Sequence, residues 1–219
     1  MDDLIQTMAV YALPVLFAIT LHEAAHAYAA RYFGDSTAYL QGRMSLNPLK
    51  HIDPFGTIVI PILLYIATSG AFLFGYAKPV PIDYGNLRKP KRDMAWVALA
   101  GPASNFVMAL IWMIFAIVLA VAGVEEEFFS RMAQAGVLSN LVMLAFNLFP
   151  IPPLDGGRVL TSILPHRYAY KFAQIEPYGF FIVMALVMLK VLYFWMVPVM
   201  TIAHAALKLI LSPLTIFLS

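Results

Sequence analysis

The chain contains no cysteine, and charged residues make up only 12% of its 219 positions. The lack of cysteine excludes disulfide bonds and thiolate metal ligands. The scarcity of charge excludes an ordinary soluble domain, which carries about twice that proportion of charged residues. With 62% of its residues hydrophobic, the chain has the composition of a polytopic membrane protein.

Two further absences narrow the class of protein. The formal net charge is +2 and no basic run is long, so we do not expect nucleic acid as a partner. The N-terminal Met-Asp-Asp lacks the basic region and the small-residue cleavage site of a signal peptide. We therefore expect the apolar stretch that begins at Leu4 to remain in the protein as a permanent helix.

The apolar segments predict an all-α polytopic membrane protein. Since a spanning helix needs about 20 mostly apolar residues, we expect about five to six membrane segments. The first should end at the helix stop Gly34-Asp35, and the tail at 198–219 should be a partial span or an interfacial helix. A single membrane-embedded domain is expected over 1–219, with its strongest spans at 4–33, 94–124, 132–149 and 178–197.

Two segments are harder to assign. Residues 37–44 are predicted to form a short strand. Basic residues gather in three loops (35–56, 76–93 and 154–177), whereas the N-terminus and residues 125–127 are acidic. If all three basic loops face the cytoplasm, the apolar segment 57–75 must enter and leave on one side, with Pro61 and Gly70 as break points. An ordinary span that violates the charge rule once is the alternative.

Glu23 and Asp155 are the two acidic residues that do not fall in loops or at segment ends, and ionisable groups at membrane depth are usually functional. Glu23 belongs to the sequence His22-Glu-Ala-Ala-His26. Residues four apart share a helix face, so both imidazoles can reach one metal ion. Glu23, rotated about 100° from His22, can miss the metal and act as a general base. Two solvated polar residues are the alternative, which the apolar flanks disfavour.

Asp155 follows a run of prolines in Asn147-Leu-Phe-Pro-Ile-Pro-Pro-Leu-Asp155-Gly-Gly. Proline removes a backbone donor and breaks a helix, here within apolar sequence. A carboxylate placed at the helix restart can complete a site of two histidines and one carboxylate, in which zinc keeps an open position. The alternative is that Asp155 caps a following helix at 156–164.

The two motifs, in this order, resemble the site-2 protease family of intramembrane zinc metalloproteases. The first corresponds to the family's H-E-x-x-H and the second to its N-x-x-P-x-x-P-x-D-G, while Gly101-Pro-Ala-Ser-Asn105 is similar to its G-P-x-x-N segment. The resemblance covers about residues 5–165, followed by C-terminal membrane segments at 178–219. The chain looks like a core-only member that lacks a PDZ or nucleotide-sensing CBS domain.

The resemblance implies hydrolysis of peptide bonds in or near the transmembrane segments of membrane proteins. It implies one Zn²⁺ held by His22, His26 and Asp155, with Glu23 as the catalytic acid and base. Asn147 would orient the substrate or stabilise the oxyanion, and Asn105 would support the site from behind the ligands or serve in packing. The expected setting is a prokaryotic cytoplasmic membrane, with the active site toward the cytoplasm and a transmembrane protein as substrate.

A membrane metal transporter or metal-binding protein that uses the same ligands is the main alternative. It would need further ligands along a path through the membrane, and the sequence offers only Glu23, which fits a general base better. The histidines outside the motif are not assigned to the metal. We expect His51 and His166 to be solvated, and His204 to face an interface.

Overall fold

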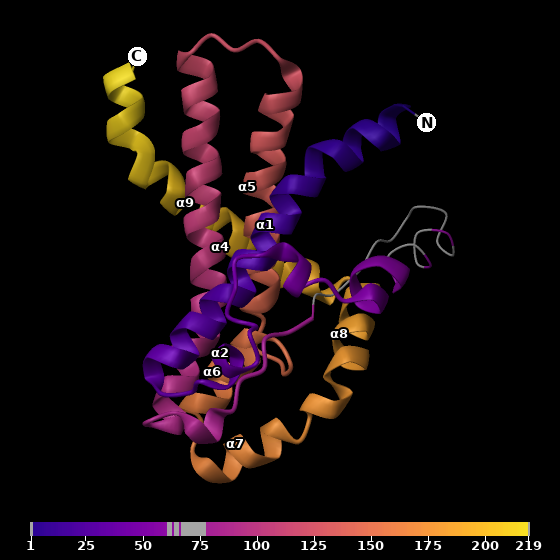
Figure 1. Ribbon diagram of the computed structural model, residues 1–219, viewed down its shortest axis with the longest axis vertical. Coiled ribbons are helices and arrows are strands. Elements are labelled where there is room, and N and C mark those ends of the chain that lie inside the picture. Colours follow the sequence, from indigo (N-terminus) through magenta and orange to yellow (C-terminus); the bar gives the residue numbers. More distant parts are fainter. Residues whose placement is uncertain (1, 61–62, 64–65, 67–77, 219) are drawn as a thin grey trace.

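The structure is a computed structural model that describes residues 2–60, 63, 66 and 78–218. Within this part of the chain the regular elements are all helical, and no residue forms a β-strand (Figure 1). In chain order they are α1 (Asp2–Phe33), α2 (Thr37–Leu40), η1 (Pro48–Lys50), η2 (Pro54–Val59), η3 (Tyr84–Asn86), α4 (Pro90–Val121), α5 (Glu127–Asn147), α6 (Asp155–Ile163), α7 (His166–Ala173), η4 (Glu176–Tyr178), α8 (Gly179–Met188) and α9 (Val191–Leu218).

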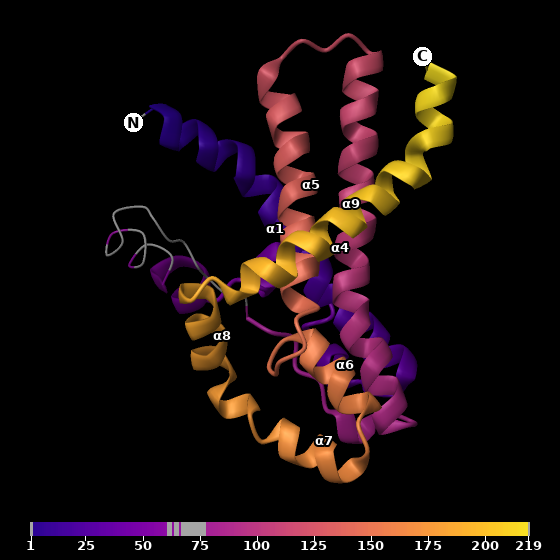
Figure 2. The same cartoon turned by 180° about the vertical axis from the view of Figure 1, so that it is seen from behind.

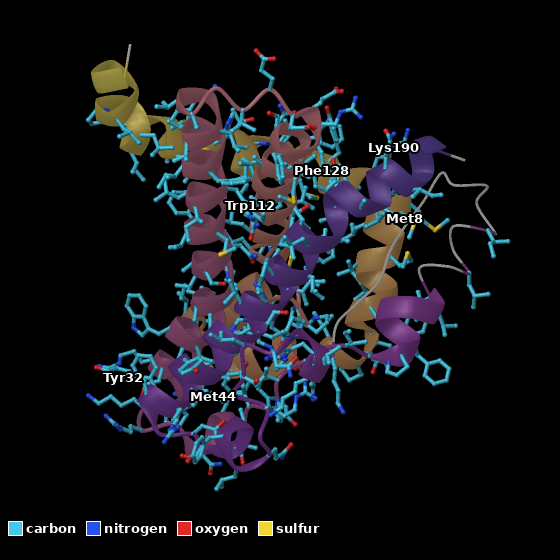
Figure 3. The ribbon with its side chains drawn as sticks, turned by 45° about the horizontal axis from the view of Figure 1, so that its top comes forward. Met8, Tyr32, Met44, Trp112, Phe128 and Lys190 are labelled. Atoms are coloured by element: carbon cyan, nitrogen blue, oxygen red, sulfur yellow. The ribbon has the colours of Figure 1, made fainter. Side chains whose placement is uncertain are left out.

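Helices α1, α4 and α5 form the bundle that carries the site. The antiparallel helices α4 and α5 lie side by side and are joined at one end of the molecule, and α1 crosses them obliquely (Figure 1). Trp112 of α4, labelled in Figure 3, lies against Gly136 of α5, where a Cβ atom would collide with the indole ring. Close approach of the two helices therefore depends on that glycine.

Helix α1 ends at Gly34-Asp35, as the sequence predicted, and the structure adds that the acid is buried. Gly34 has φ +117°, a conformation that side chains disfavour, and it turns the chain out of the helix. Asp35 is only 1% exposed, and its carboxylate accepts the backbone N–H groups of Thr37 (3.0 Å) and Asp83 (2.9 Å). Its Oδ1 also accepts Asn86 Nδ2 at 3.3 Å. Asp35 thus joins α1 to the distant segment that precedes α4.

The predicted break at the prolines is confirmed. Helix α5 ends at Asn147 and α6 begins at Asp155, with a cis peptide bond between Pro152 and Pro153. The start of α6 lies directly against this loop, because Cβ atoms on Gly156 and Gly157 would collide with the backbone of residues 148–152. The two glycines therefore let the loop and the helix that carries Asp155 pack together without intervening side chains.

The C-terminal helix covers the bundle from behind. Helix α9 crosses α4 and α5 diagonally, as Figure 2 shows. Its contact is an apolar cluster that buries Ala203 and Leu207 of α9 against residues of α4 and α5 (Ala109, Leu141 and Leu144). Helices α6 and α7 lie at the end of the molecule opposite the connector between α4 and α5 (Figure 1).

Four helices in the described residues are long and apolar enough to cross a membrane: 5–33, 90–121, 166–188 and 191–214. The chain is therefore a multi-pass membrane protein. The third of these spans combines α7, η4 and α8. Helix α5, expected as a span at 132–149, has 21 residues but carries seven polar ones, so it falls outside this set. The expected number of five to six segments is not confirmed.

Two expectations about local structure were wrong. Residues 37–44 form no strand: Thr37–Leu40 is a helical turn that starts where Asp35 accepts the N–H of Thr37. The expected span at 178–197 is broken at Lys190, which has φ 58°, and the tail from 198 continues α9. Neither a glycine nor a proline marks that break in the sequence. The proposed re-entry of 57–75 falls largely on residues 61–62, 64–65 and 67–77, which lie outside the described residues.

Asp35 makes a testable contribution to stability. Burial raises the pKa of its carboxyl group, but hydrogen bonds from Thr37, Asp83 and Asn86 outweigh burial and lower the pKa below its ordinary 3.8. The stabilisation is therefore fully present above pH 3.8 and is lost as the pH falls toward the lower pKa of the folded protein.

We expect Asp35→Ala to reduce the free energy of unfolding at neutral pH by about 3 kcal/mol, because buried donors lose their acceptor. The measurement is unfolding in detergent micelles, with the exposed Glu126→Ala as control. The difference from wild type should shrink below pH 3.8. An equal effect of the two substitutions at neutral pH would contradict the assignment.

Candidate metal centre

His22 and His26 face the interior of the bundle from adjacent turns of α1. Both are buried, with 4% and 7% of their surfaces exposed. Their Nε2 atoms lie 3.1 Å apart, and their rings are nearly perpendicular, with an interplanar angle of 85°. The i, i+4 spacing has therefore brought both imidazoles to one point, as the sequence predicted.

Asp155 meets the two histidines from α6. Its Oδ2 lies 3.2 Å from His22 Nε2 and 3.3 Å from His26 Nε2. The same oxygen is buried and has no hydrogen-bond donor among the described residues. Helix capping does not account for Asp155, because Leu154 is the N-cap residue of α6 and no side chain caps that helix.

Hydrogen bonds at the other ring nitrogens fix the tautomers of both histidines. His26 Nδ1 lies 2.7 Å from the carbonyl oxygen of Val97, which can only accept, so this nitrogen carries the proton. His22 Nδ1 lies 2.7 Å from Asn105 Oδ1 and must likewise donate. In the neutral imidazoles, Nε2 then has a lone pair and no hydrogen, and both lone pairs are directed at the same small region.

The orientation of Asn105 is itself fixed by a chain of amides. Asn105 Nδ2 donates to the carbonyl of Ala18 (3.2 Å) and to Asn140 Oδ1 (3.0 Å). Asn140 Nδ2 donates in turn to the carbonyl of Gly136 at 2.8 Å. Both asparagines are fully buried. Because carbonyl oxygens only accept, each amide has one permitted orientation, and that orientation leaves Asn105 Oδ1 to accept from His22.

Gly101 of α4 makes room for the two imidazoles. A Cβ atom at this position would collide with Nε2 of His26 and Cε1 of His22. The rings therefore pack directly on the backbone of α4, close to the Val97 carbonyl and the Asn105 amide that orient them. A glycine inside a helix is unfavourable by about 1 kcal/mol relative to alanine. The close approach of the two imidazoles explains why a glycine is nevertheless present at this position.

The three atoms suit a metal cation. With both imidazoles neutral, two nitrogen lone pairs and a carboxylate oxygen repel one another at separations of 3.1 to 3.3 Å. Ligand atoms about 2.0 Å from a tetrahedrally coordinated zinc ion lie about 3.3 Å apart, which agrees with these separations. His22, His26 and Asp155 are also the one group of three metal-binding side chains found among the described residues.

Glu23 lies beside this cluster but points to a different partner. Its Oε2 accepts the backbone N–H of Val80 at 2.7 Å. Glu23 is half-buried, whereas the three clustered side chains are buried. Glu23 is not among the three side chains whose ligand atoms converge.

Comparison with known proteins agrees with this geometry. The model of peptidase family M50 matches residues 10–136 and 117–190. The chain belongs to peptidase family M50, the site-2 protease family. It is 39% identical over 183 residues to the candidate zinc metalloprotease YwhC of Bacillus subtilis, covering 80% of this chain and 78% of that protein. Over 188 residues it is 33% identical to the candidate zinc metalloprotease Rip2 of Mycolicibacterium smegmatis, with coverages of 82% and 67%. No solved structure matches.

The structure also shows the surroundings of the other residues singled out from the sequence of this M50 peptidase. Asn147 is the last residue of α5, half-buried, with Nδ2 donating to the carbonyl of Met143 at 3.0 Å. His166 is exposed, as expected. The expectation for His51 was wrong: it is 1% exposed, with Nε2 2.8 Å from the carbonyl oxygen of Ser45.

Sequence reasoning missed three contributors to this M50 site. Asn140 was not singled out, although an asparagine between Ser139 and Leu141 in an apolar helix was a usable signal. The contacts made by the backbone groups of Val97 and Val80 do not depend on residue type, so the sequence does not reveal them. Asn105, for which the sequence predicts a supporting or packing role, contacts His22 directly.

We expect Gly101→Ala to abolish tight zinc binding, because its methyl group would displace both imidazoles from their hydrogen-bond partners. The measurement is the zinc content of purified protein together with competition against a chelator. Ala103→Val, on an exposed position of the same helix, is the control and should bind zinc as wild type does. Equal affinity of Gly101→Ala and the control would show that the imidazoles do not depend on this contact.

Proposed function

We propose that His22, His26 and Asp155 hold one zinc ion, and that Glu23 is the general acid and base of a membrane-embedded endopeptidase. The chain is an intramembrane zinc metalloprotease, and its substrates are proposed to be membrane proteins cleaved in or near a transmembrane segment. The observation that carries the proposal is the convergence of three proton-free ligand atoms in the interior of the helix bundle.

The rival function, metal transport, is not favoured. A transport path needs a succession of ligand groups across the membrane. Among the described residues no second cluster of three histidine, cysteine or acidic side chains accompanies the first. The nearby acid, Glu23, accepts a backbone N–H and is half-buried, which suits proton transfer at a single site rather than passage of an ion.

The roles of the side chains follow from their chemistry. Zinc, when bound, supplies Lewis acidity that polarises a carbonyl and activates water. Glu23, one residue after a ligand, is placed to accept a proton from the attacking water and return it to the leaving amine. Asn105 and the Val97 carbonyl hold the imidazoles in the tautomer that binds metal.

Asn147 is proposed to orient the substrate or to donate to the developing oxyanion. It stands at the point where α5 ends and the proline-rich loop leads to Asp155. One amide N–H is engaged by the Met143 carbonyl, and an asparagine amide has a second one to donate. A helical substrate hides its carbonyl groups in its own hydrogen bonds, so cleavage should favour segments that unwind easily, such as those with glycine, proline or polar residues.

The direct test is cleavage of a reporter transmembrane substrate by purified protein in detergent or lipid. We expect Glu23→Gln to retain zinc and to cleave about 10²- to 10⁴-fold more slowly than wild type, because a general base typically contributes that factor. Chelation of zinc should abolish cleavage by wild type, and added zinc should restore it. Undiminished processing by Glu23→Gln would overturn the assigned role.

Two matched variants separate the other roles. Asp155→Asn keeps the shape of the side chain and removes its charge, so it should weaken zinc binding. Asn147→Leu should keep zinc and cleave more slowly. Normal zinc affinity in Asp155→Asn would show that Asp155 is not the third ligand. Normal cleavage by Asn147→Leu would show that Asn147 has no role in the mechanism.

The active-site end is proposed to face the cytoplasm of a prokaryotic cell. Helices α6 and α7 lie opposite the acidic connector between α4 and α5, and the loops at 76–93 and 154–177 are rich in basic residues (Figure 1). Basic loops favour the cytoplasmic side of a membrane.

Because the chain has no cysteine, single cysteines can report this orientation without background. We expect Glu126→Cys to react with a membrane-impermeant maleimide on intact cells, and Arg167→Cys to react only after permeabilisation. Both positions are exposed, so the side of the membrane on which each lies decides whether the maleimide reaches it. The opposite labelling pattern would invert the topology, and labelling of both in intact cells would refute the proposed separation.

A further inference from the structure

Residues 78–83, which form no helix or strand, lie against α1 beside the proposed base, and we call this segment the strap. The backbone N–H of Val80 in the strap donates to Glu23 Oε2 at 2.7 Å. The contact joins residues 57 positions apart in the sequence. Hydrogen bonds to charged groups are stronger than neutral ones, so this contact restricts the orientation of the Glu23 carboxylate.

Side chains hold the strap in register with α1. Val80 is 7% exposed and packs in an apolar cluster with Ala27 of α1 and Ala38 of α2. Ala27 is one helical turn after Glu23 and therefore lies on the same face of α1. The Val80 side chain thus fills a gap between two small residues while its N–H reaches the carboxylate.

Polar contacts anchor the strap at both ends. At its start, Arg43 Nη2 donates to the carbonyl oxygens of Lys78 (2.9 Å) and Pro79 (3.4 Å), and the Lys78 N–H donates to the carbonyl of His51 at 2.9 Å. At its end, the Asp83 N–H donates to buried Asp35 at 2.9 Å. Because both ends are tied, the strap cannot slide along α1 without breaking several hydrogen bonds.

The prolines of the strap leave it a single donor at this point. Pro79 and Pro81 have no N–H, so Val80 supplies the only backbone donor between residues 79 and 81. Residues that precede proline are also confined to extended conformations. The sequence Pro-Val-Pro therefore presents one N–H from a stiff, extended backbone to one carboxylate oxygen.

We propose that the strap is a positioning device for the base, and that the Val80 N–H fixes which carboxylate oxygen of Glu23 exchanges the proton. Val80 is a positioning residue because it acts through Glu23. With Oε2 engaged by Val80, Oε1 is the oxygen left to exchange the proton. This inference rests on the proposed function of Glu23 and adds a structural element outside the metal-binding motifs.

The test removes the N–H and nothing else, as nearly as a substitution allows. Val80→Pro abolishes the donor in a segment whose neighbouring prolines already favour the conformation that proline adopts. Val80→Ala is the matched control, since it shortens the buried side chain but keeps the donor. We expect Val80→Pro to lower kcat about 10- to 100-fold with unchanged KM and zinc content, because a hydrogen bond to a charged group is lost.

Val80→Ala should lower kcat by a clearly smaller factor than Val80→Pro, because the hydrogen bond to Glu23 persists although the packing of the strap is weakened. In the Glu23→Gln background Val80→Pro should cause little further loss, since the two substitutions affect one proton transfer. Wild-type kcat in Val80→Pro at full zinc content would overturn the inference. So would an increase in KM at unchanged kcat, which would mean that the strap binds substrate instead.

A second variant decides the matter if Val80→Pro fails to fold or to bind zinc. Arg43→Gln removes two hydrogen bonds that hold the strap and leaves Val80 and the ligands intact. Lower kcat at normal zinc content and KM supports the inference, and wild-type kcat refutes it. A wild-type protein that binds zinc but cleaves no reporter would instead refute the proposed function, so the two failures are distinguishable.

Discussion

Two imidazole nitrogens and one carboxylate oxygen meet within 3.3 Å of one another in the interior of the helix bundle. All three are electron-pair donors when the imidazoles are neutral, because the hydrogen bonds at Nδ1 keep the single ring proton away from them. Burying such a group is costly without a cation. Much of the surrounding fold provides for this convergence: α1 supplies the histidine pair, α4 orients it and gives it space at Gly101, and α6 delivers the carboxylate.

The delivery of Asp155 requires an interrupted helix, which a membrane protein tolerates only where protein covers the exposed backbone. Three prolines end α5, and the backbone of the loop is covered by the start of α6, because Gly156 and Gly157 let the two segments touch. Arg158, one residue further, donates to the Tyr84 hydroxyl and to Glu176 at 3.2 Å. Asp155 is thus held by the proline-rich loop that packs on the start of α6 and by the hydrogen bonds of Arg158.

The sequence predicted the elements that depend on residue type and local spacing. The end of α1 at Gly34, the break after Asn147 and the meeting of His22, His26 and Asp155 were all expected. Features that depend on tertiary contacts were not expected from the sequence. Asp35 is buried and accepts the N–H of Asp83, a partner 48 residues away, and Lys190 breaks an apolar helix without a glycine or proline. Likewise, the burial of His51 and the role of Asn140 arise from contacts that no local pattern encodes.

The ligands and the proposed base are positioned by different parts of the chain. Backbone carbonyls of Ala18, Val97 and Gly136, all within the helix bundle, determine the orientation of the imidazoles directly or through asparagine amides. The Glu23 carboxylate is instead oriented by an N–H from the strap, which is anchored outside the bundle by Arg43 and Asp35. A displacement of the strap would therefore change the geometry of proton transfer while the metal ligands kept theirs. Because the metal ligands and Glu23 are positioned by different segments, a molecule that contacts the strap can change turnover without changing metal binding.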